Sequence, residues 1–299
     1  MNQHILITGG TGFIGQLLCH QLHCEGRSLT VLSRRDKAEV QRLCGRVEVI
    51  HRLDDVPAIP AIDAVINLAG EGIAEKRWTQ QRKQALWDSR IALTDELVSQ
   101  LQRRNALPDA MISGSAVGYY GDQSEADVTE ATDPRDEFTH RLCAAWEASA
   151  TRLGGDTRVC LSRTGLVIGR DGGFLQQMLP LFRLGLGGRL GNGRQYMPWI
   201  HRQDMVQGLI HLLDSPDLSG AFNLTGPEPV TNAEFTRALA KALNRPACLP
   251  VPAVALKLAL GEMARLLLTG QKARPQRLLE SGFVFQYPSV DQALAEAVG

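Results

Sequence analysis

The sequence predicts an α/β fold, in which a Rossmann-type doubly wound parallel sheet is followed by a smaller C-terminal substrate lobe. A short apolar run at residues 5–7 breaks into glycines and is followed at once by a helical pattern. Strand-like and helical segments then alternate through residues 1–165, as expected for a parallel sheet covered on both faces. Beyond Arg163 the pattern becomes Gly-rich. We therefore expect residues 166–299 to form mainly the lobe, with segments such as 199–225 returning to the sheet domain.

Composition narrows the classes of function. The 299 residues can bury a large core, and 32 Lys and Arg residues balance 32 Asp and Glu residues. A formal net charge of zero argues against a broad surface for nucleic acid or for an anionic membrane. No basic segment followed by an apolar stretch precedes the first strand, so no signal peptide is expected.

The cysteines predict a reduced protein without a structural metal. Six cysteines stand at irregular spacings and form no CxxC, which favours neither a disulfide framework nor a zinc site, and a cytoplasmic location fits best. Cys19, His20, His23 and Cys24 pair at i,i+4 on the first helix and could resemble metal ligands. Because no further ligand residue stands nearby, ordinary packing and solvated positions are the preferred interpretation, and we expect no metal site.

The glycines after the first strand fit a phosphate loop. Gly10-x-Gly12-x-x-Gly15 matches the common dinucleotide fingerprint, and Gly9 with Gly12 and Gly15 matches a second spacing. Glycine allows a tight turn and a close backbone approach, and the N–H groups at the following helix start can hold a pyrophosphate. A purely structural turn between strand and helix is the alternative. The helix should end near Gly26.

The second strand, residues 29–32, ends in Ser33, Arg34 and Arg35. This point lies about twenty residues past the loop, where the fold meets the adenosine ribose. An acid there would favour NAD, whereas a hydroxyl and two guanidiniums suit a 2′-phosphate, so the predicted cofactor is NADP. Alternatively, the arginines form a solvated turn in which Asp36 neutralises one of them.

Further along, strand candidates at residues 47–50 and 64–70 precede a helical region at about residues 79–104. A fifth strand, residues 110–113, opens into a Gly-rich turn that contains Ser115, Tyr119 and Tyr120. Hydroxyls at the carboxyl end of a strand are well placed for chemistry. Serine and tyrosine in such a turn can also be only turn formers.

The rest of the chain predicts two more strands and three more helices. We expect helices at residues 138–153 and 231–243, the second with a Thr231–Glu234 capping box, and strands at residues 159–162 and 221–224. The apolar segment 251–268 is interrupted by charged residues, which predicts a packed helix rather than a membrane span.

Six motifs together resemble the extended short-chain dehydrogenase/reductase superfamily, in its epimerase-like branch with NADP-type features. They are TGGTGFIG at 8–15, NLAG at 67–70, SAVGYYG at 115–121, RTGLVIG at 163–169, WIHRQDM at 199–205 and FNLTGPEPVTNAEF at 222–235. The resemblance runs nearly end to end and is far more specific than the glycines alone.

The resemblance implies a set of cofactor-binding residues. They are Gly9, Gly12, Phe13 and Ile14 at the pyrophosphate, Ser33 and Arg34 at the 2′-phosphate, Leu68 and Ala69 along the cofactor, and Arg90 in the long helix. Arg90 stands where the superfamily often has an asparagine near the catalytic group.

The chain departs from the superfamily at its catalytic pair. The family normally uses a tyrosine as acid/base and a lysine one helical turn later, which lowers the pKa of the tyrosine and binds the nicotinamide ribose. None of the four tyrosines is followed by lysine at the fourth position, and the expected positions hold about Thr139 and Cys143. Neither residue can do the same work at neutral pH.

Two functions follow as hypotheses. The first is an NADP-dependent oxidoreductase or epimerase-like enzyme for an unidentified small carbonyl or sugar-type substrate, in which Ser115 polarises a substrate oxygen and Tyr119 or Tyr120 replaces the missing acid. The second is a catalytically reduced NADP-binding regulator or scaffold protein. A homodimer through two helices per subunit is common in the superfamily, but the sequence does not decide it.

Overall fold

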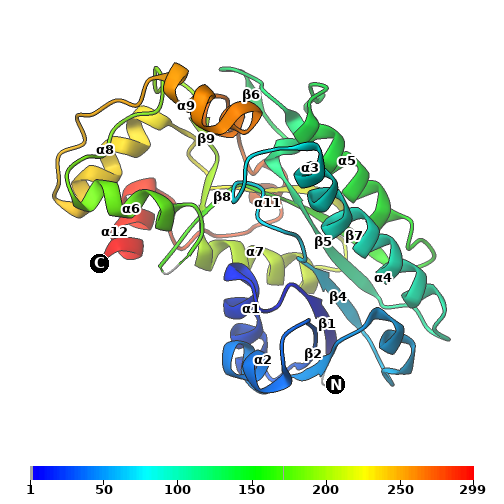
Figure 1. The fold of residues 1–299 in the computed structure, drawn as a ribbon. Helices are drawn as coiled ribbons and strands as arrows, with labels where there is room; N and C mark the ends of the chain where they lie inside the picture. Colours follow the sequence, from blue (N-terminus) through cyan, green and yellow to red (C-terminus); the bar gives the residue numbers. More distant parts are fainter. Residues whose placement is uncertain (1–2, 171) are drawn as a thin grey trace.

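In the computed structural model, which describes residues 3–170 and 172–299, a seven-stranded sheet has the order β11-β7-β5-β4-β1-β2-β3 (Figure 1). All its neighbouring strands pair in parallel. The strands are β1 (His4–Thr8), β2 (Ser28–Leu32), β3 (Glu48–Ile50), β4 (Ala64–Asn67), β5 (Ala110–Ala116), β7 (Arg158–Thr164) and β11 (Gly220–Leu224).

Helices cover both faces of this sheet, which confirms the predicted fold class. Alternate residues of β1 point to opposite faces, so Ile5 and Ile7 pack into one apolar cluster and Leu6 into another. The first cluster includes residues of α1 (Phe13–Cys24), α2 (Lys37–Cys44) and α7 (Arg202–Asp214). The second includes residues of α4 (Leu93–Gln102) and α5 (Phe138–Thr151). Figure 1 shows these two helical layers on either side of the strands.

The long helical region has an irregularity that the periodicity did not predict. The N-cap of α3 (Gln80–Trp87) is Thr79, whose side chain accepts a hydrogen bond from Arg82 N. It continues through a π-helical turn at Asp88–Ala92 into α4. A π turn inserts one residue into the helical repeat and is frequent at functional sites. Arg90 lies in the middle of it.

The later part of the chain builds a lobe around Trp199, Phe235 and Leu294, all of which are buried. Its elements are β8 (Leu166–Ile168), α6 (Leu175–Arg183), β9 (Tyr196–Met197), β10 (Trp199–His201), β12 (Val230–Thr231), α8 (Asn232–Leu243) and α12 (Val290–Val298). The predicted capping box is present at the start of α8. β11 pairs with β7 in the main sheet, while the predicted boundary at residue 165 stays a prediction.

The segment 251–268 differs from the single packed helix that its composition predicts. It forms α9 (Ala253–Leu260), a 3-10 turn η4 (Gly261–Ala264) and α10 (Arg265–Leu268). The break occurs at Gly261, whose φ of +61° is unfavourable for other residues. No residue of α9 is buried. Within the described ranges, no helix is long and apolar enough to cross a membrane.

Short elements complete the described chain. They are η1 (Leu53–Ala58), η3 (Val117–Tyr120), β6 (Asp127–Val128), β13 (Lys272–Ala273) and α11 (Gln276–Glu280). β13 pairs with β6 and ties the C-terminal segment to the stretch that follows η3.

Candidate active site

The turn between β1 and α1 is shaped by its glycines. Gly9 has a φ of +73°, and a Cβ atom there would lie 2.7 Å from the backbone carbon of Leu68. A Cβ at Gly15 would lie 2.3 Å from the Gly9 oxygen. Gly12 is the N-cap of α1, and no described side chain caps that helix. The N–H groups of the first turn, at Phe13 and Ile14, are therefore positioned to meet an anion.

The end of β2 presents one unpaired cation beside a buried serine. Ser33 is buried, and its Oγ accepts a hydrogen bond from Arg35 N at 3.1 Å. The guanidinium of Arg35 forms an ion pair with Glu39, and not with Asp36. Arg34 is exposed and has no partner among the described residues. Of the two predicted arginines, Arg34 is the one whose charge is uncompensated.

Polar residues align where β1 and β4 end. Thr8 pairs in register with Asn67, and the Thr8 Oγ1 donates to Asn67 Oδ1 at 2.6 Å. The same Oγ1 accepts a hydrogen bond from Ala69 N at 3.2 Å. These contacts hold Leu68 and Ala69 against the glycine turn.

Arg90 reaches the same edge from the π-helical turn. Its Nη2 donates to the Glu71 carbonyl at 2.8 Å, and a Cβ at Gly70 would lie 3.0 Å from its Cζ. Its guanidinium also lies over the ring of Trp146, 5.3 Å from the centroid. Burial lowers the pKa of Arg90. The guanidinium lies beside Gly70, next to Leu68 and Ala69, where the resemblance expects the cofactor.

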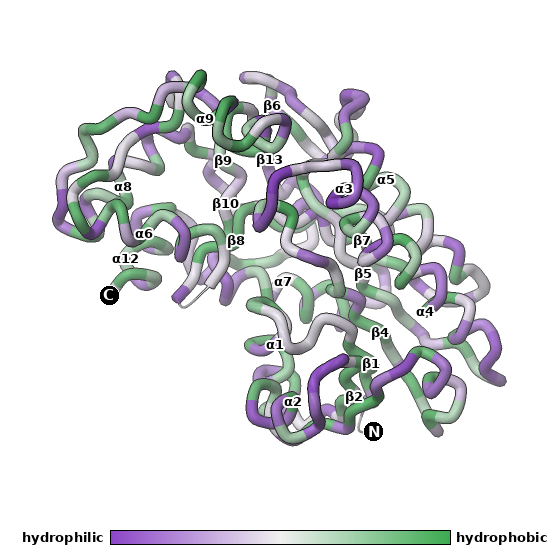
Figure 2. The backbone as a smooth tube through the Cα atoms, in the orientation of Figure 1, coloured by the Kyte–Doolittle hydropathy of each residue, from purple (hydrophilic) through white to green (hydrophobic). Residues whose placement is uncertain are grey.

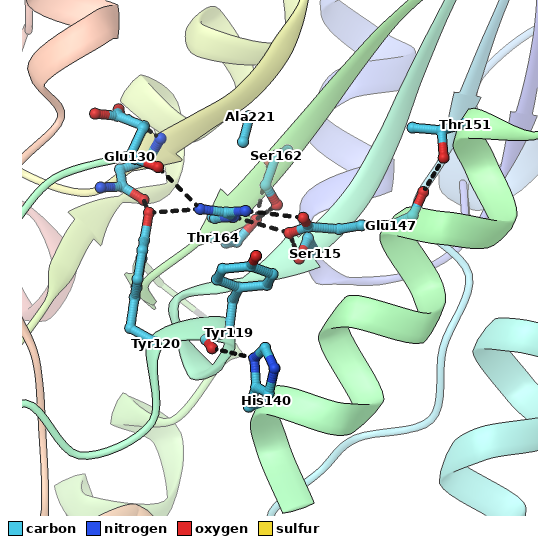
Figure 3. Close-up of polar contacts among 12 residues, drawn as sticks. Ser115, Tyr119, Tyr120, Glu130, His140, Glu147, Thr151, Ser162, Thr164 and Ala221 are labelled. Atoms are coloured by element: carbon cyan, nitrogen blue, oxygen red, sulfur yellow. Dashed lines mark hydrogen bonds and ion pairs between the residues drawn. The ribbon is translucent and has the colours of Figure 1, made fainter. Parts of the chain in front are cut away.

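A buried ion pair lies at the carboxyl end of β5 and β7. Arg163 Nε and Nη2 donate to the two carboxylate oxygens of Glu147 at 2.8 and 2.9 Å. Ser115 Oγ donates to the same carboxylate at 2.6 Å. Burial alone would lower the pKa of Arg163, but the bonds to Glu147 outweigh it and raise that pKa. Figure 3 shows Ser115 and Glu147 facing each other between the strands and α5.

The two tyrosines of η3 have different surroundings. Tyr120 is completely buried, and its hydroxyl donates to Asn223 Oδ1 at 2.7 Å and accepts from Arg163 Nη1 at 3.0 Å. Burial raises the pKa of Tyr120 to about 12. The ring of Tyr119 lies 3.5 Å from the Arg163 guanidinium carbon, and its carbonyl accepts from His140 Nδ1 at 2.7 Å (Figure 3). The Tyr119 hydroxyl has no hydrogen-bond partner among the residues that the structure describes.

α5 packs against this turn through the two residues at the expected catalytic positions. A Cβ atom at Gly118 would lie 3.2 Å from Thr139 Cβ and 3.8 Å from Cys143 Sγ. Burial raises the pKa of the Cys143 thiol to about 12, so the thiol stays protonated at neutral pH.

Sequence reasoning missed Glu147, Arg163 and Asn223 as members of this network. The sequence could have indicated a role for Arg163, because it follows an apolar run that was predicted to be a buried strand. An arginine buried there needs a partner of opposite charge. Nothing in the local sequence indicates that the partner is Glu147 on α5.

Known proteins match this chain over most of its length. Residues 5–225 match the model of the NAD dependent epimerase/dehydratase family, and residues 251–297 match a domain of unknown function. An epimerase family protein of Mycobacterium bovis is 42% identical over 303 residues, covering 99% of this chain and 98% of that protein.

Solved structures agree with this match. The human epimerase family protein SDR39U1 (isoform 2), crystallised with NADPH, superposes with a TM-score of 0.90 at 35% identity, covering 99% of each chain. A UDP-glucose 4-epimerase of Thermotoga maritima, 15% identical with a TM-score of 0.80, covers 99% of this chain and 97% of its own and shares the fold. The resemblance inferred from the six motifs is thereby confirmed, and the chain belongs to the NAD dependent epimerase/dehydratase family.

Proposed function

We propose that this protein binds NADP(H) and acts as an epimerase-like enzyme or oxidoreductase on a small carbonyl or sugar-type substrate. The proposal depends on one observation: the glycine turn and the Ser115–Glu147–Arg163 network lie at the same edge of the sheet. β1 and β5 are separated only by β4, and their carboxyl ends point the same way. Ligands of open α/β sheets bind at this edge.

The cofactor end of the site fits NADP(H). Gly9 and Gly12 leave room for a pyrophosphate on the first turn of α1, and Ser33 with Arg34 offers a hydroxyl and a free guanidinium for a 2′-phosphate. The human relative was crystallised with NADPH. Bound NADP(H) would supply or accept a hydride.

At the reacting end, we assign different roles to the predicted catalytic residues. Tyr119 carries the unpartnered hydroxyl, so it would donate a hydrogen bond to a substrate oxygen. Ser115 already donates its proton to Glu147 and keeps lone pairs that can accept from a substrate hydroxyl. Tyr120 is buried and would position Arg163 without touching substrate.

Cofactor titration tests the first half of the proposal. NADPH should bind about tenfold or more tightly than NADH, because a charge-assisted contact to the 2′-phosphate contributes about 1.5–3 kcal/mol. Arg34→Ala should remove most of that preference. Arg35→Ala is the matched control, because Glu39 already engages that arginine. Equal affinities for NADPH and NADH would contradict the assignment.

Turnover tests the second half. NADPH oxidation is followed with a panel of small carbonyl compounds and sugar nucleotides, using wild type, Tyr119→Phe and Ser115→Ala. Tyr119→Phe should lose activity while keeping NADPH affinity. A Tyr119→Phe variant as active as wild type would refute the role given to this hydroxyl.

A catalytically reduced NADP-binding regulator is the second candidate, and Thr139 and Cys143 favour it. They occupy the expected positions of the catalytic tyrosine and lysine, and burial keeps the Cys143 thiol protonated at neutral pH. Tight NADPH binding without turnover on the whole panel would support this candidate. A cytoplasmic location and homodimer formation stay predictions, which cell fractionation and light scattering test.

A further inference from the structure

The C-terminal lobe contains two long stretches without an acidic residue. Residues 172–203 include four arginines and no Asp or Glu, and residues 235–261 include two arginines and two lysines, also without an acid. The chain as a whole has equal numbers of acidic and basic residues, so this imbalance is local. A stretch of one sign produces a local positive potential even though the net charge of the protein is zero.

These two stretches lie side by side at one end of the lobe. Leu249 N donates to the Gly187 carbonyl at 3.2 Å, and Arg245 Nε donates to the Arg183 carbonyl at 3.1 Å. In Figure 1 the chain that follows α6 and the chain that precedes α9 run together along the outer side of the lobe, away from the seven-stranded sheet. Residues 181–189 and 244–250 therefore form one surface, which we call the lobe tip.

Four leucines of the lobe tip are exposed to solvent. They are Leu181, Leu184, Leu186 and Leu249, with exposed fractions of 54%, 72%, 49% and 51%. Leu186 N donates to the Leu181 carbonyl at 2.9 Å, and Leu249 pairs with the residue after Leu186, so the leucines come from neighbouring positions. Figure 2 shows hydrophobic positions (green) interspersed with hydrophilic ones (purple) along this side of the lobe. Single exposed leucines are normal on a protein surface, whereas neighbouring ones indicate a contact surface.

Four exposed arginines flank these leucines. They are Arg183, Arg189, Arg237 and Arg245. The hydrogen bond from Arg245 to the Arg183 carbonyl places its guanidinium beside the backbone that leads into Leu184. Arg189 and Arg237 line one hollow together with Cys248. None of the four arginines forms an ion pair with a described residue, and the one acid of α8, Glu234, is engaged in the capping box. The lobe tip therefore presents uncompensated positive charge beside exposed apolar side chains.

This combination matches the surface of an anionic phospholipid membrane. Guanidinium groups bind phosphate through charge-assisted hydrogen bonds, and apolar side chains enter the boundary between headgroups and acyl chains. An apolar segment of a partner protein would instead need a groove that receives its side chains. Leu184, the most exposed of the four leucines, projects from the lobe tip rather than lining a groove.

We propose that the lobe tip docks the protein on membranes that contain anionic phospholipids, with the leucines entering the headgroup region and the arginines contacting phosphate groups. Docking of this kind is peripheral and reversible, because its strength comes from a small apolar area and from charges that salt screens. The glycine turn and the η3 tyrosines lie on other elements, so the proposal is independent of the cofactor and substrate assignments above.

Co-sedimentation with lipid vesicles tests the proposal. Full-length protein is mixed with vesicles of phosphatidylcholine alone, or with vesicles made from an equal mixture of phosphatidylcholine and phosphatidylserine. The bound fraction of protein is measured at increasing lipid and salt concentrations. We expect binding to the mixed vesicles, little binding to phosphatidylcholine alone, and a loss of binding at high salt.

Variants of the lobe tip identify the surface that binds. Arg183→Gln combined with Arg245→Gln should weaken binding to the mixed vesicles by about tenfold or more, because each arginine near an anionic membrane adds to the attraction. Leu184→Ser should weaken binding by about tenfold, because a polar side chain then replaces the one that enters the headgroup region.

Matched control variants change the same residue types elsewhere. Arg42→Gln combined with Arg46→Gln removes two exposed arginines in and after α2, and Val284→Ser changes an apolar residue that is 84% exposed. Both controls should bind the mixed vesicles like wild type. NADPH affinity, measured separately by titration, should be unchanged in all the variants, so failure of this inference is distinguishable from failure of the cofactor proposal.

The inference is overturned if the mixed vesicles do not bind the protein, if phosphatidylcholine vesicles bind it equally, or if the lobe-tip variants bind like wild type. Retention on immobilised polyglutamate without binding to vesicles would also overturn it, and would assign the lobe tip to an acidic protein partner instead.

Discussion

Replacing Glu147 by glutamine should strongly destabilise the protein. The side chains of Glu147 and Arg163 are only 9% and 6% exposed, and they share two hydrogen bonds. Glu147→Gln keeps the size of the side chain but leaves the Arg163 guanidinium buried without a countercharge. Its remaining acceptors would be the amide oxygen of the new glutamine, the Tyr120 hydroxyl and the Glu130 carbonyl, all of which are uncharged.

The expected loss is about 3–5 kcal/mol in the free energy of unfolding, the usual cost of breaking a buried ion pair on one side. Arg163→Leu should cost a similar amount, because it leaves the carboxylate unpaired. The double variant Glu147→Leu with Arg163→Leu removes both charges. It should cost less than the sum of the single variants, since only uncharged groups then lose partners: the hydroxyls of Ser115 and Tyr120 and the Glu130 carbonyl, at about 1–3 kcal/mol each.

Wild type, the two single Leu variants and the double variant form a double-mutant cycle, once Glu147→Leu is added to the set. Urea unfolding followed by circular dichroism measures the free energy of unfolding of each. Arg141→Gln serves as the exposed control, because Arg141 and Asp136 are 57% and 77% exposed, and its cost should stay below about 1 kcal/mol. If Glu147→Gln also costs less than about 1 kcal/mol, or if the cycle is additive, the reasoning about this buried pair is wrong.

Three further predictions concern the cofactor edge and Tyr120. Gly9→Ala should abolish NADPH binding, because its Cβ would meet the Leu68 backbone, whereas Gly26→Ala, with a φ of +79° and open space around it, should bind NADPH normally in the same titration. Arg90→Met should weaken NADPH binding by about tenfold, the value of one charge-assisted contact. Arg77→Met, which changes an exposed arginine, should leave NADPH binding unchanged. Equal titration curves for these two variants would show that Arg90 is not part of the cofactor site. Burial raises the pKa of Tyr120 to about 12 from a usual 10, so the folded state holds the hydroxyl proton more tightly than the unfolded chain does. The resulting contribution to the free energy of unfolding is fully present below pH 10 and is lost as pH rises toward 12, by up to about 3 kcal/mol. Tyr120→Phe should flatten this part of the stability curve between pH 10 and 12, and an unchanged slope would contradict the assignment.

Local patterns were sufficient to predict much of the fold. Periodicity located the strands of the sheet and the helices α1, α3, α4 and α5, and the glycine spacing located the turn before α1, because those features depend on neighbouring residues. The helices α2 and α7, which also pack on the sheet, were not predicted. The π-helical turn at Asp88–Ala92 could not be predicted this way. It shifts the helical register by one residue, and the sequence DSRIA of that turn contains no residue type that indicates the shift.

The candidate site was only partly predictable. Ser33 directly follows β2 and Ser115 is the penultimate residue of β5, so their place at the sheet edge followed from topology. The contact between Tyr120 and Asn223 joins residues 103 positions apart, and it exists because β11 returns to pair with β7. Segment 251–268 was expected to be a packed helix because of its apolar composition. Composition does not reveal that Gly261 breaks the helix or that a cavity lies under α9.

The missing catalytic lysine raises a final question, whether restoring it at Cys143 would be tolerated. Cys143 is only 5% exposed, and Arg90 acts electrostatically on it from the π-helical turn. The nearest acid one turn later, Glu147, already accepts three hydrogen bonds from Arg163 and Ser115. An ammonium group at position 143 would therefore be buried beside a like charge without a free partner.

Cys143→Lys should accordingly lower the free energy of unfolding by about 3 kcal/mol or more, whereas Cys143→Met, which adds similar bulk without charge, should cost about 1–3 kcal/mol. Urea unfolding of the two variants makes the comparison. Equal stability would show that the site has room and countercharge for the lysine, and that its loss says nothing about chemistry. A clear deficit for Cys143→Lys would instead show that the surroundings of position 143, with Arg90 nearby and Glu147 already bonded to Arg163, no longer accommodate the lysine of the superfamily's catalytic pair.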